Sequence, residues 1–555
     1  MSTGSRFVVA RGRLSWRDPS GRHLRDYDLW DIAIVALLAA LGILVLATFG
    51  DYAVSNDEEV QRHYGELILQ FYYSGLHDQA LFHYKNLYLY GGLFDIVSGL
   101  VERLLPGVEP YAIRHVLCAL TGIAGIAATA AIARLIAGPR AGFIAAVALA
   151  VCGPWYGAMF NHTKDIPFAA AMAGGFFFLL RATRQFPRPQ AGHIVPFGLL
   201  LGAALGIRVL ALLLVGYAGL AVAARTLQKR SSSWRDRLDF FARSALALIP
   251  VFVIGYAIMI VAWPWAGLAP LNPIRGLVDF GNFHYDIRTI LDGRVYVMDA
   301  VPRWYVPAYL LIKLPLVLLA GASVAIVMLA ARWRDIAHGN RAFETALLAF
   351  AALFPVLCEV IEKGPAFTGL RHFLFVVPML AALAGIGFDA LLSRLRNWWP
   401  KAAAAGLAAL AAVTVWTTAK LVQLHPYEYL YFNPLVGGLQ GASGRYATDY
   451  WVNIMPEAVE RLEDYVAQLD RAGGHPQRYL VAVCGERVPF EVEANSRLQW
   501  TDDWDRAEFF IAPTHMNCDR ALTGRIISGI DRLGARIGVV KDRRSVLRND
   551  VARHP

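Results

Sequence analysis

Charged residues are scarce in this chain. Asp, Glu, Lys and Arg together make up 17% of its 555 residues, whereas hydrophobic residues make up 56%. A soluble protein this apolar would be unusual, so the composition indicates a membrane protein. The net charge of +10 comes from basic residues that lie in short runs between apolar stretches, not along one continuous face. We therefore expect no nucleic-acid partner and interpret these runs as topology signals.

Several chemical motifs are missing as well. The sequence contains no Walker-type glycine loop, no nucleophile elbow and no spacing typical of metal ligands. ATP-driven transport and serine hydrolase chemistry therefore lose support, no cofactor is expected, and no ligand spacing supports a divalent cation. The sequence also has no convincing internal repeat, a feature that would favour a transporter.

Long apolar runs are abundant. A helix of about 20 apolar residues spans a bilayer, and roughly eleven runs qualify, near residues 29–49, 114–136, 141–158, 166–181, 194–208, 209–224, 244–263, 309–331, 343–361, 372–392 and 402–424. Six arginines between Arg6 and Arg25 precede the first run, so the positive-inside rule places the N-terminus in the cytoplasm. The first run is too long for a signal-peptide core, and we expect an uncleaved anchor.

The interval 194–224 has two interpretations, because Arg208 interrupts it. It forms either one tilted helix or a tight hairpin of two short ones. A hairpin places the later basic segments on the cytoplasmic side, whereas a single span inverts every later loop and breaks the positive-inside rule repeatedly. We therefore predict a hairpin with Arg208 near its outer turn. The loops at roughly 50–113, 159–165, 264–308 and 362–371, and the segment after about His425, then lie outside.

Two outer regions show a secondary-structure pattern of their own. In the first outer loop, Val60–Tyr73 and Leu87–Leu100 mix aromatic residues with helical apolar spacing. This pattern suits helices lying at the membrane interface, although ordinary packing of a loop against the bundle also fits. The sequence thus predicts a polytopic α-helical membrane protein with about eleven transmembrane helices and interfacial helices in the first outer loop.

The tail from about residue 425 regains charge and has no spanning run. Strand-like runs at Tyr479–Cys484 and Phe509–Pro513 alternate with helical runs at Pro456–Leu469 and Ile526–Leu533, which indicates a small C-terminal α/β domain. We expect a transmembrane domain at 1–424 and an outer domain at 425–555. Two of the five cysteines, Cys484 and Cys518, fall in this tail and can pair in an oxidising compartment.

Acidic residues follow two of the apolar runs. Asp57-Glu58-Glu59 lies just past the first run, and Lys164-Asp165 lies at the start of the fourth. A carboxylate near the lipid boundary can take a proton from an attacking hydroxyl, although three acids in a row also suit a solvated loop cap. Lys164 is placed to hold a phosphate at the membrane surface, or to act as an interfacial anchor.

Further cations are expected on the same side of the membrane. They are Arg208 at the hairpin turn, Arg303 in Pro302-Arg-Trp-Tyr305, and Arg371 in Arg371-His372 at the start of the tenth run. Arginine binds phosphate in a planar bidentate fashion. Together with Lys164 they indicate a basic pocket beside an acidic base, which fits an enzyme acting on a lipid-borne substrate.

These motifs resemble a known family. The early Asp-Glu pair, the long amphipathic first loop, Lys164-Asp-Ile-Pro-Phe168, Pro302-Arg-Trp-Tyr305 and Gly369-Leu-Arg-His-Phe-Leu-Phe375 are similar to those of the bacterial relatives of protein O-mannosyltransferases, the group that also holds the aminoarabinose transferases. Tyr431-Phe-Asn-Pro-Leu-Val-Gly-Gly438 and Asp449-Tyr-Trp451 are similar to that group too. The resemblance covers roughly residues 27–465. One departure is His162-Thr163, where relatives often have Asn-Pro.

The resemblance implies a GT-C glycosyltransferase that moves one sugar from a polyprenyl-phosphate donor to a lipid, polysaccharide or protein acceptor, usually with inversion. It implies Asp57 as general base, Glu58 as its supporting neighbour and Asp165 as a second acid near the acceptor. Lys164 and Arg371, with Arg208 and Arg303, would hold the donor phosphate. The expected acceptor or sugar contacts are His162, His372 and Tyr305.

The resemblance also implies a location, the bacterial inner membrane, with the N-terminus cytoplasmic and the C-terminal domain periplasmic. Two other functions stay open at this point. One is a transporter or flippase of lipid-linked saccharides, and the other is a polymerase or ligase that uses a diphosphate-linked donor.

Overall fold

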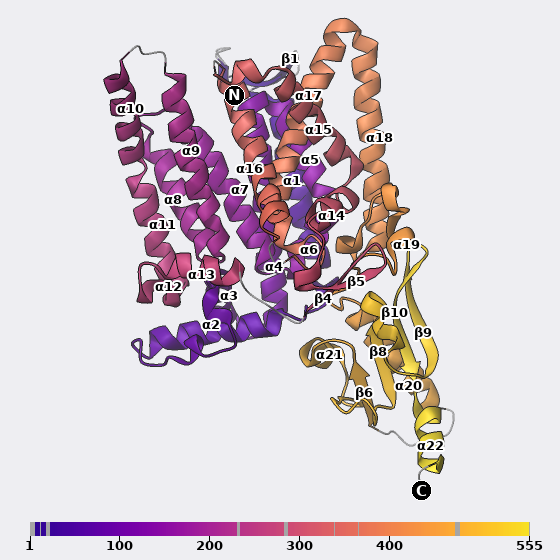
Figure 1. Cartoon of the computed structure of the whole chain (residues 1–555). Helices are drawn as coiled ribbons and strands as arrows, with labels where there is room; N and C mark the ends of the chain where they lie inside the picture. Colours follow the sequence, from indigo (N-terminus) through magenta and orange to yellow (C-terminus); the bar gives the residue numbers. More distant parts are fainter. Residues whose placement is uncertain are drawn as a thin grey trace, which may run out of the picture.

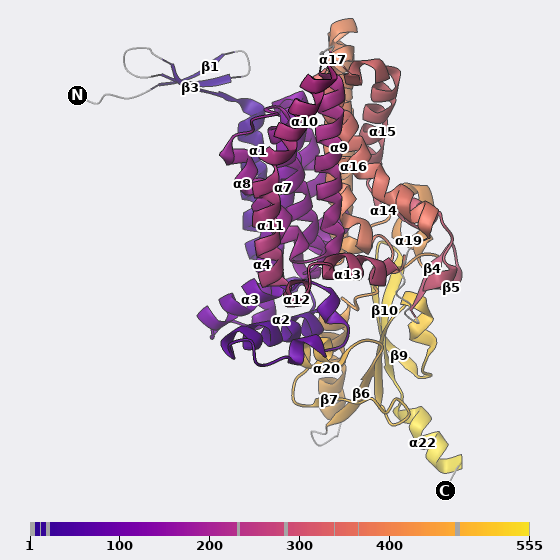
Figure 2. The same cartoon turned by 60° about the vertical axis from the view of Figure 1, so that its left-hand side comes forward.

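The computed structural model describes residues 6–10, 13–17, 23–229, 233–281, 287–337, 339–363, 366–471 and 478–553. Long helices form a bundle, and at one end of it lie short helices and a small sheet domain (Figure 1). Near the other end lies a three-stranded antiparallel sheet of the N-terminal segment, formed by β1 (Arg6–Ala10), β2 (Arg13–Arg17) and β3 (His23–Asp28), which projects sideways in Figure 2.

The predicted apolar runs all fall on helices. The bundle contains α1 (Leu29–Thr48), α4 (Pro110–Ala137), α5 (Pro139–Ala150), α6 (Gly153–Asn161), α7 (Asp165–Thr183), α8 (Ala191–Leu205), α9 (Leu212–Gln228), α10 (Trp234–Ala247), α11 (Ile249–Ala262), α14 (Tyr305–Lys313), α15 (Leu316–Ala331), α16 (Asn340–Glu362), α17 (Val377–Trp398) and α18 (Pro400–Leu424). Within the described ranges, eight spans are long and apolar enough to cross a membrane, or ten if each bent helix pair is one span. The predicted count of about eleven is therefore not confirmed.

Two of the predicted spans are sharply bent. The axis turns by 66° between α5 and α6 and by 116° between α14 and α15. Proline explains both breaks, because Pro154 and Pro315 lack the amide hydrogen that would continue the helix. At the second break, Leu314 also has the extended backbone that a following proline favours (φ −81°, ψ 143°). At the second bend, the side-chain amide of Asn433 donates to the carbonyls of Leu311 and Leu314 at 2.6 and 2.9 Å. These contacts satisfy carbonyls that the break leaves without helical partners.

The interval around Arg208 is a hairpin, as the charge pattern predicted. α8 ends at Leu205, the short 3-10 helix η4 (Val209–Ala211) follows, and α9 begins at Leu212. Gly206 permits a close approach at this turn, because a Cβ there would lie 2.7 Å from the side chain of Ala262. The turn places Arg208 at the same end of the bundle as the start of α7.

Helices cross the end of the bundle in the first long loop. They are α2 (Glu58–Tyr73) and α3 (Leu93–Leu104), which lie below the bundle in Figure 1. One face of α2 is buried through Tyr64 and Ile68. The segments predicted at 60–73 and 87–100 are therefore helical over most of their length. Across the same end run α12 (Pro264–Leu268), α13 (Asn272–Gly281) and the hairpin of β4 (Arg288–Leu291) and β5 (Arg294–Val297).

The C-terminal region contains a five-stranded sheet in the order β7-β6-β8-β10-β9. Its elements are α20 (Met455–Arg471), β6 (Tyr479–Val483), α21 (Arg487–Glu493), β7 (Leu498–Trp500), β8 (Phe509–Pro513), β9 (Arg525–Arg532), β10 (Ala535–Asp542) and α22 (Arg544–Arg553). β6 pairs in parallel with β7 and β8, whereas β10 is antiparallel to β8 and β9. Cys484 and Cys518 form a disulfide, with Cα atoms 6.4 Å apart.

One predicted element of this domain is wrong. Ile526–Leu533 was expected to be helical, but residues Arg525–Arg532 form strand β9. The chain reverses at Leu533-Gly534, both with positive φ (46° and 78°), and β9 pairs with β10 along its length. Such a two-residue turn matches the twist of an antiparallel hairpin. The pairing with β10, which no local pattern encodes, decides between helix and strand.

Candidate active site

The three acids of the first outer loop have three different partners. Glu58 is buried: it accepts a hydrogen bond from the backbone N–H of Ser55 at 2.7 Å, and its carboxylate lies 3.2 Å from the His115 ring. The backbone N–H of Glu58 in turn donates to the Ser55 carbonyl at 3.1 Å, so these two residues close a turn that leads into α2. Glu59 accepts a hydrogen bond from the hydroxyl of Tyr111. Both side chains are therefore engaged in holding the loop to α4.

Asp57 is different, because its carboxylate does not cap the helix that it precedes. Its Oδ2 accepts a hydrogen bond from Nη2 of Arg371 at 2.5 Å, and 41% of its side chain is exposed. Among the three acids, it is the one whose carboxylate faces a cation at the open end of the bundle. This geometry suits a group that exchanges a proton with a bound molecule.

Arg371 connects two acids. It stands at the start of the 3-10 helix η7 (Arg371–Val376), which leads into α17. While Nη2 binds Asp57, Nε donates to Oδ2 of Asp165 at 3.0 Å. The guanidinium also lies over the ring of Trp451, 4.3 Å from its centroid. These contacts hold the cation in one orientation at the mouth of the bundle.

Asp165 is the buried anchor of the cluster. It opens α7, where the helix dipole favours an anion. One carboxylate oxygen binds Arg371 and the other accepts a hydrogen bond from Arg208 at the α8–α9 turn. Its side chain is only 3% exposed. The structure thus brings together four predicted residues, Asp57, Asp165, Arg208 and Arg371, from four separate parts of the sequence.

Lys164 lies next to this cluster. Its side chain is buried, and its ammonium group stands over the ring of Tyr90 at 4.3 Å from the centroid. Burial lowers the pKa of Lys164 to about 8, although Asp95 and Asp57 oppose the shift. Asp95 is itself bound by Arg114 at 2.5 Å in a buried ion pair between α3 and α4. Sequence reasoning missed this pair, because neither residue stands beside another motif.

His162 lies in an aromatic surround. Its ring centroid is 5.7 Å from those of Tyr429 and Trp451 and 6.2 Å from that of Tyr450. Nδ1 is 3.7 Å from a carboxylate oxygen of Asp165. Burial lowers the pKa of His162 to about 4, so the ring is neutral at pH 7. The imidazole therefore lies beside the Asp165 carboxylate as a buried, uncharged neighbour.

The segment 446–454 was missed as part of the site, although Asp449-Tyr-Trp451 belongs to the family resemblance. Asp449 is buried and accepts hydrogen bonds from the hydroxyl of Tyr429 and from the backbone N–H groups of Asn453 and Ile454. These contacts fix the loop that carries Tyr450 and Trp451 against Arg371. The usable signal was an acid followed directly by two aromatic residues.

Lys313 is a second missed residue. Its buried ammonium donates to the carbonyl of Tyr429 at 2.7 Å and stands 4.0 Å from the centroid of the Phe432 ring. With His162 and Arg371 it lines a small pocket behind the cluster. An ionisable residue inside an apolar run is a functional candidate by itself. The lysine within the run 309–331 was therefore the signal.

Three predicted residues lie outside the cluster. Arg303 donates to the carbonyls of Val360 and Ile361 at the end of α16, and the ring of His372 packs against Phe367, 4.6 Å between centroids. Tyr305 is fully buried, and its hydroxyl accepts a hydrogen bond from the backbone N–H of Gly369 at 2.8 Å. Tyr305 thereby holds the backbone just before Arg371 and does not present its hydroxyl to a ligand.

The C-terminal domain contacts the same end of the bundle. The side-chain carbonyl of Asn56, next to Asp57, accepts a hydrogen bond from the backbone N–H of Glu486 at 3.1 Å. The ring of His515 lies 6.4 Å from that of Tyr450, centroid to centroid. Two loops of the sheet domain therefore abut the site. Within the described ranges, no group of three or more His, Cys, Asp or Glu side chains is arranged to hold a metal ion.

Part of the chain matches a known family. Residues 101–256 match the family model described as dolichyl-phosphate-mannose-protein mannosyltransferase. This segment includes Lys164, Asp165 and Arg208, and over it the match confirms the resemblance that the motifs indicated. A search of curated proteins finds no match to this chain.

Solved structures of three transferases are similar in outline. ArnT from Cupriavidus metallidurans bound to undecaprenyl phosphate is 15% identical, with 92% of this chain and 98% of that chain covered and a TM-score of 0.48. The archaeal oligosaccharyltransferase AglB from Archaeoglobus fulgidus is 11% identical, with coverages of 87% and 69% and a TM-score of 0.49. Arabinofuranosyltransferase AftD from Mycobacteria is 13% identical, with coverages of 91% and 40% and a TM-score of 0.41.

Proposed function

We propose that this protein is a membrane glycosyltransferase that moves one sugar from a polyprenyl-phosphate donor to an acceptor. The observation that carries the proposal is the cluster at one end of the bundle. In it the partly exposed carboxylate of Asp57 pairs with Arg371, and Lys164 lies nearby. The family match over residues 101–256 supports a lipid-phosphate-linked sugar as donor. A base and a phosphate-binding cation side by side are the two groups that such a transfer requires.

In the proposed reaction, Asp57 takes the proton from the acceptor hydroxyl while the acceptor oxygen attacks the anomeric carbon. The bond from that carbon to the phosphate oxygen breaks on the opposite face, so the configuration inverts. The electron pair leaves with the polyprenyl phosphate, and Lys164 and Arg371 neutralise its charge. No proton needs to reach the leaving oxygen.

The ion pair between Asp57 and Arg371 links donor binding to proton removal from the acceptor. While Arg371 binds Oδ2 of Asp57, that oxygen is occupied and does not face an acceptor hydroxyl. Donor phosphate competes with Asp57 for Arg371, and its arrival frees the carboxylate to accept a proton. Arg371 keeps its second contact with the buried Asp165 throughout. We propose this positioning role for Asp165 in place of the acceptor contact that the resemblance implied.

Lys313 is a further phosphate-binding candidate in this scheme, since it lines the pocket behind Arg371. Arg303 loses support as a phosphate ligand, because it binds the carbonyls at the end of α16. The loops of the C-terminal domain near Asn56 and Tyr450 are placed to contact an acceptor.

The proposed membrane follows from the family resemblance, and the proposed orientation follows from the charge pattern. We infer that the chain lies in a bacterial inner membrane, with its N-terminus in the cytoplasm and residues 425–555 in the periplasm beyond a transmembrane domain at 1–424. Residues 425–454 pack against the bundle, as Asn433 at the α14 break and Asp449 beside the cluster illustrate. The outer segment is thus anchored to the transmembrane domain beside the site.

Mass spectrometry of cell-envelope lipids and glycans, with and without the gene, tests the proposal and names the acceptor. We expect one sugar to be missing from one class of molecule in the deletion strain and restored by the wild-type gene but not by Asp57→Asn. Accumulation of an intact lipid-linked saccharide on the cytoplasmic face would instead indicate a flippase. Loss of polymer length with every sugar type retained would indicate a diphosphate-donor polymerase.

A further inference from the structure

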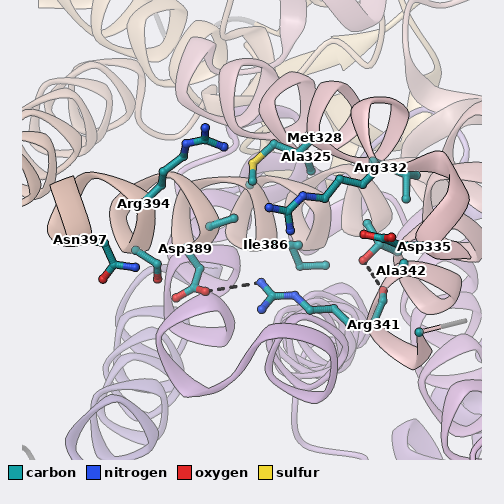
Figure 3. Close-up of a pocket in the computed structure, with 16 residues that line it drawn as sticks. Ala325, Met328, Arg332, Asp335, Arg341, Ala342, Ile386, Asp389, Arg394 and Asn397 are labelled. Atoms are coloured by element: carbon teal, nitrogen blue, oxygen red, sulfur yellow. Dashed lines mark hydrogen bonds and ion pairs between the residues drawn. The ribbon is translucent and has the colours of Figure 1, made fainter.

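A second polar pocket lies at the opposite end of the bundle from the candidate active site. α17 links the two places: η7, with Arg371, precedes its first turn, and Asp389 and Arg394 near its other end line the pocket. A helix of 22 residues separates them by about 30 Å. The pocket has a volume of about 820 Å³ and lies between the ends of α15, α16 and α17 (Figure 3). That volume is within the range of small-molecule sites.

The pocket opens where two closely packed helices separate. Within the bundle α15 and α17 nearly touch, since a Cβ on Gly387 would lie 2.1 Å from the carbonyl oxygen of Gly321. Toward the helix ends, the larger side chains of Met328 on α15 and of Arg332 just after it face those of α17 across the pocket (Figure 3). The two helices touch where both have glycine and stand further apart where the side chains are long, which leaves the pocket between them.

One acid of the pocket is already neutralised. Arg140 donates from Nε to a carboxylate oxygen of Asp389 at 2.8 Å, and from Nη2 to the hydroxyl of Ser393 at 2.7 Å. Arg341 approaches the other carboxylate oxygen at 3.7 Å. Asp389 thus has cations on two sides and does not balance the remaining arginines.

Two arginines of the pocket have no acidic partner in the described part of the chain. They are Arg332, which directly follows α15, and Arg394 on α17, and Figure 3 shows Arg332 extending into the space between these helices. The one other acid that lines the pocket, Asp335, is exposed at its rim. The pocket therefore carries an excess of positive charge in a fork-shaped donor set that fits phosphate.

An apolar groove adjoins this basic pocket. It has a volume of about 410 Å³, runs between α15 and α16, and is lined by side chains that include Leu329, Trp333, Phe350, Leu353 and Leu357. Leu329 lines both the groove and the pocket. Trp333, Leu353 and Leu357 are each 45–64% exposed, although α16 is one of the candidate membrane spans. The groove therefore lies on the exposed side of a candidate membrane span, where the acyl chains of a bilayer would contact it.

We propose that the pocket and groove form a binding site for an anionic glycerophospholipid, with its phosphate at Arg332 and Arg394 and an acyl chain in the groove. A soluble phosphate compound would use the arginines but leave the apolar groove empty. A zwitterionic lipid would fill the groove but gain less from unpaired arginines, because its own cation offsets the phosphate. The combination of both features selects a lipid with net negative charge.

The test is lipid binding by the purified full-length protein, measured by native mass spectrometry with phosphatidylglycerol and phosphatidylcholine of the same chain length. We expect wild type to bind phosphatidylglycerol at least tenfold more tightly, and Arg332→Gln and Arg394→Gln each to lose about three- to tenfold of that affinity. Arg396→Gln is the matched control, because Arg396 is an exposed arginine on the same helix that does not line the pocket. It should bind like wild type.

A variant in the groove distinguishes binding of the whole lipid from binding of its phosphate alone. Ala330→Trp changes an exposed residue that lines the groove, and it should weaken phosphatidylglycerol binding while leaving competition by inorganic phosphate unchanged. A single sharp elution peak and an unchanged melting temperature in phosphatidylcholine show that each variant is folded. Equal losses in Arg394→Gln and Arg396→Gln would overturn the proposal, as would equal affinity for the two lipids.

Discussion

Asp57 and Asp165 bind neighbouring nitrogens of one guanidinium group, that of Arg371. Nη2 donates to Asp57 at 2.5 Å and Nε donates to Asp165 at 3.0 Å. The two acids differ in exposure, because 41% of the Asp57 side chain is accessible against 3% for Asp165. The buried acid therefore fixes the arginine, and the exposed acid is the one that an incoming molecule can displace.

Asp57→Asn should leave the fold intact and reduce sugar transfer by about 10²–10⁴-fold, the usual effect of losing a general base. The change is nearly isosteric and removes the proton acceptor. The control is Glu59→Gln at the same loop, where the side chain binds the Tyr111 hydroxyl, and it should retain most activity. Rates are compared at saturating donor. Near-normal turnover in Asp57→Asn would remove this residue from the mechanism.

Lys164→Ala and Arg371→Ala should each weaken binding of a polyprenyl monophosphate, the product that retains the phosphate. Loss of one charge-assisted contact is worth about 1.5–3 kcal/mol, or roughly ten- to a hundredfold in affinity. Arg303→Ala is the matched control, because that arginine binds the end of α16. Titration with the lipid phosphate in detergent measures all three.

Asp57→Asn should bind the same lipid phosphate as well as wild type or somewhat more tightly. The substitution removes a negative charge near the bound anion and breaks the ion pair that occupies Arg371. Weaker binding in Asp57→Asn would argue against competition between Asp57 and the donor phosphate.

Binding of the lipid phosphate should fall as the pH rises through about 8. Burial lowers the pKa of Lys164 to about 8, so its charge is present below that pH and lost above it. The facing charges are Asp95 and Asp57, which oppose the shift, and Arg208 and Arg371, which add to it. The phosphate itself is about nine-tenths doubly charged at pH 7, since its second pKa is about 6. Affinity measured from pH 7 to 9.5 should show one downward step.

Lys164→Arg provides the control for that step, because a guanidinium stays charged throughout this range. Its affinity should stay flat between pH 7 and 9.5. An identical fall in wild type and Lys164→Arg would assign the pH dependence to another group.

The topology makes a separate prediction. A cysteine placed near the C-terminus should react with a membrane-impermeant reagent added to cells with a permeable outer membrane, whereas one placed near residue 230 should not. The basis is the positive-inside pattern of the loops. A protected C-terminus would break the assignment of the cluster to the outer face.

The sequence predicted the parts of this structure that depend on composition and on order along the chain. Apolar runs located the helices, and the positive-inside rule identified the hairpin at Arg208. Counting the hairpin as two crossings predicts that the loops carrying Asp57, Asp165 and Arg371 lie on the same side of the membrane. The structure brings these three residues into contact. It did not determine that Asp165 is an anchor for Arg371, since a residue's partners depend on three-dimensional packing.

Residues that act through packing escaped prediction. Trp451 supports Arg371 from a loop some 80 positions later in the sequence, and Lys313 reaches the site because its helix bends by 116° just beyond it. The strand β9 carries apolar residues that suit either a helix or a strand, and its partner β10 settles the outcome. Local pattern is weakest where tertiary pairing chooses between two allowed local structures.

The central claim is transfer from a polyprenyl monophosphate sugar, and its most direct test uses the purified protein with a panel of such donors and a membrane extract as acceptor. The measurement is release of polyprenyl monophosphate, followed by mass spectrometry and by NMR of the new glycosidic bond. The account predicts that one donor is consumed, that polyprenyl monophosphate appears in equal amount with the glycosylated acceptor, that the anomeric configuration inverts, and that Asp57→Asn forms neither product. Consumption of diphosphate-linked donors alone, or transfer with retained configuration, would contradict it.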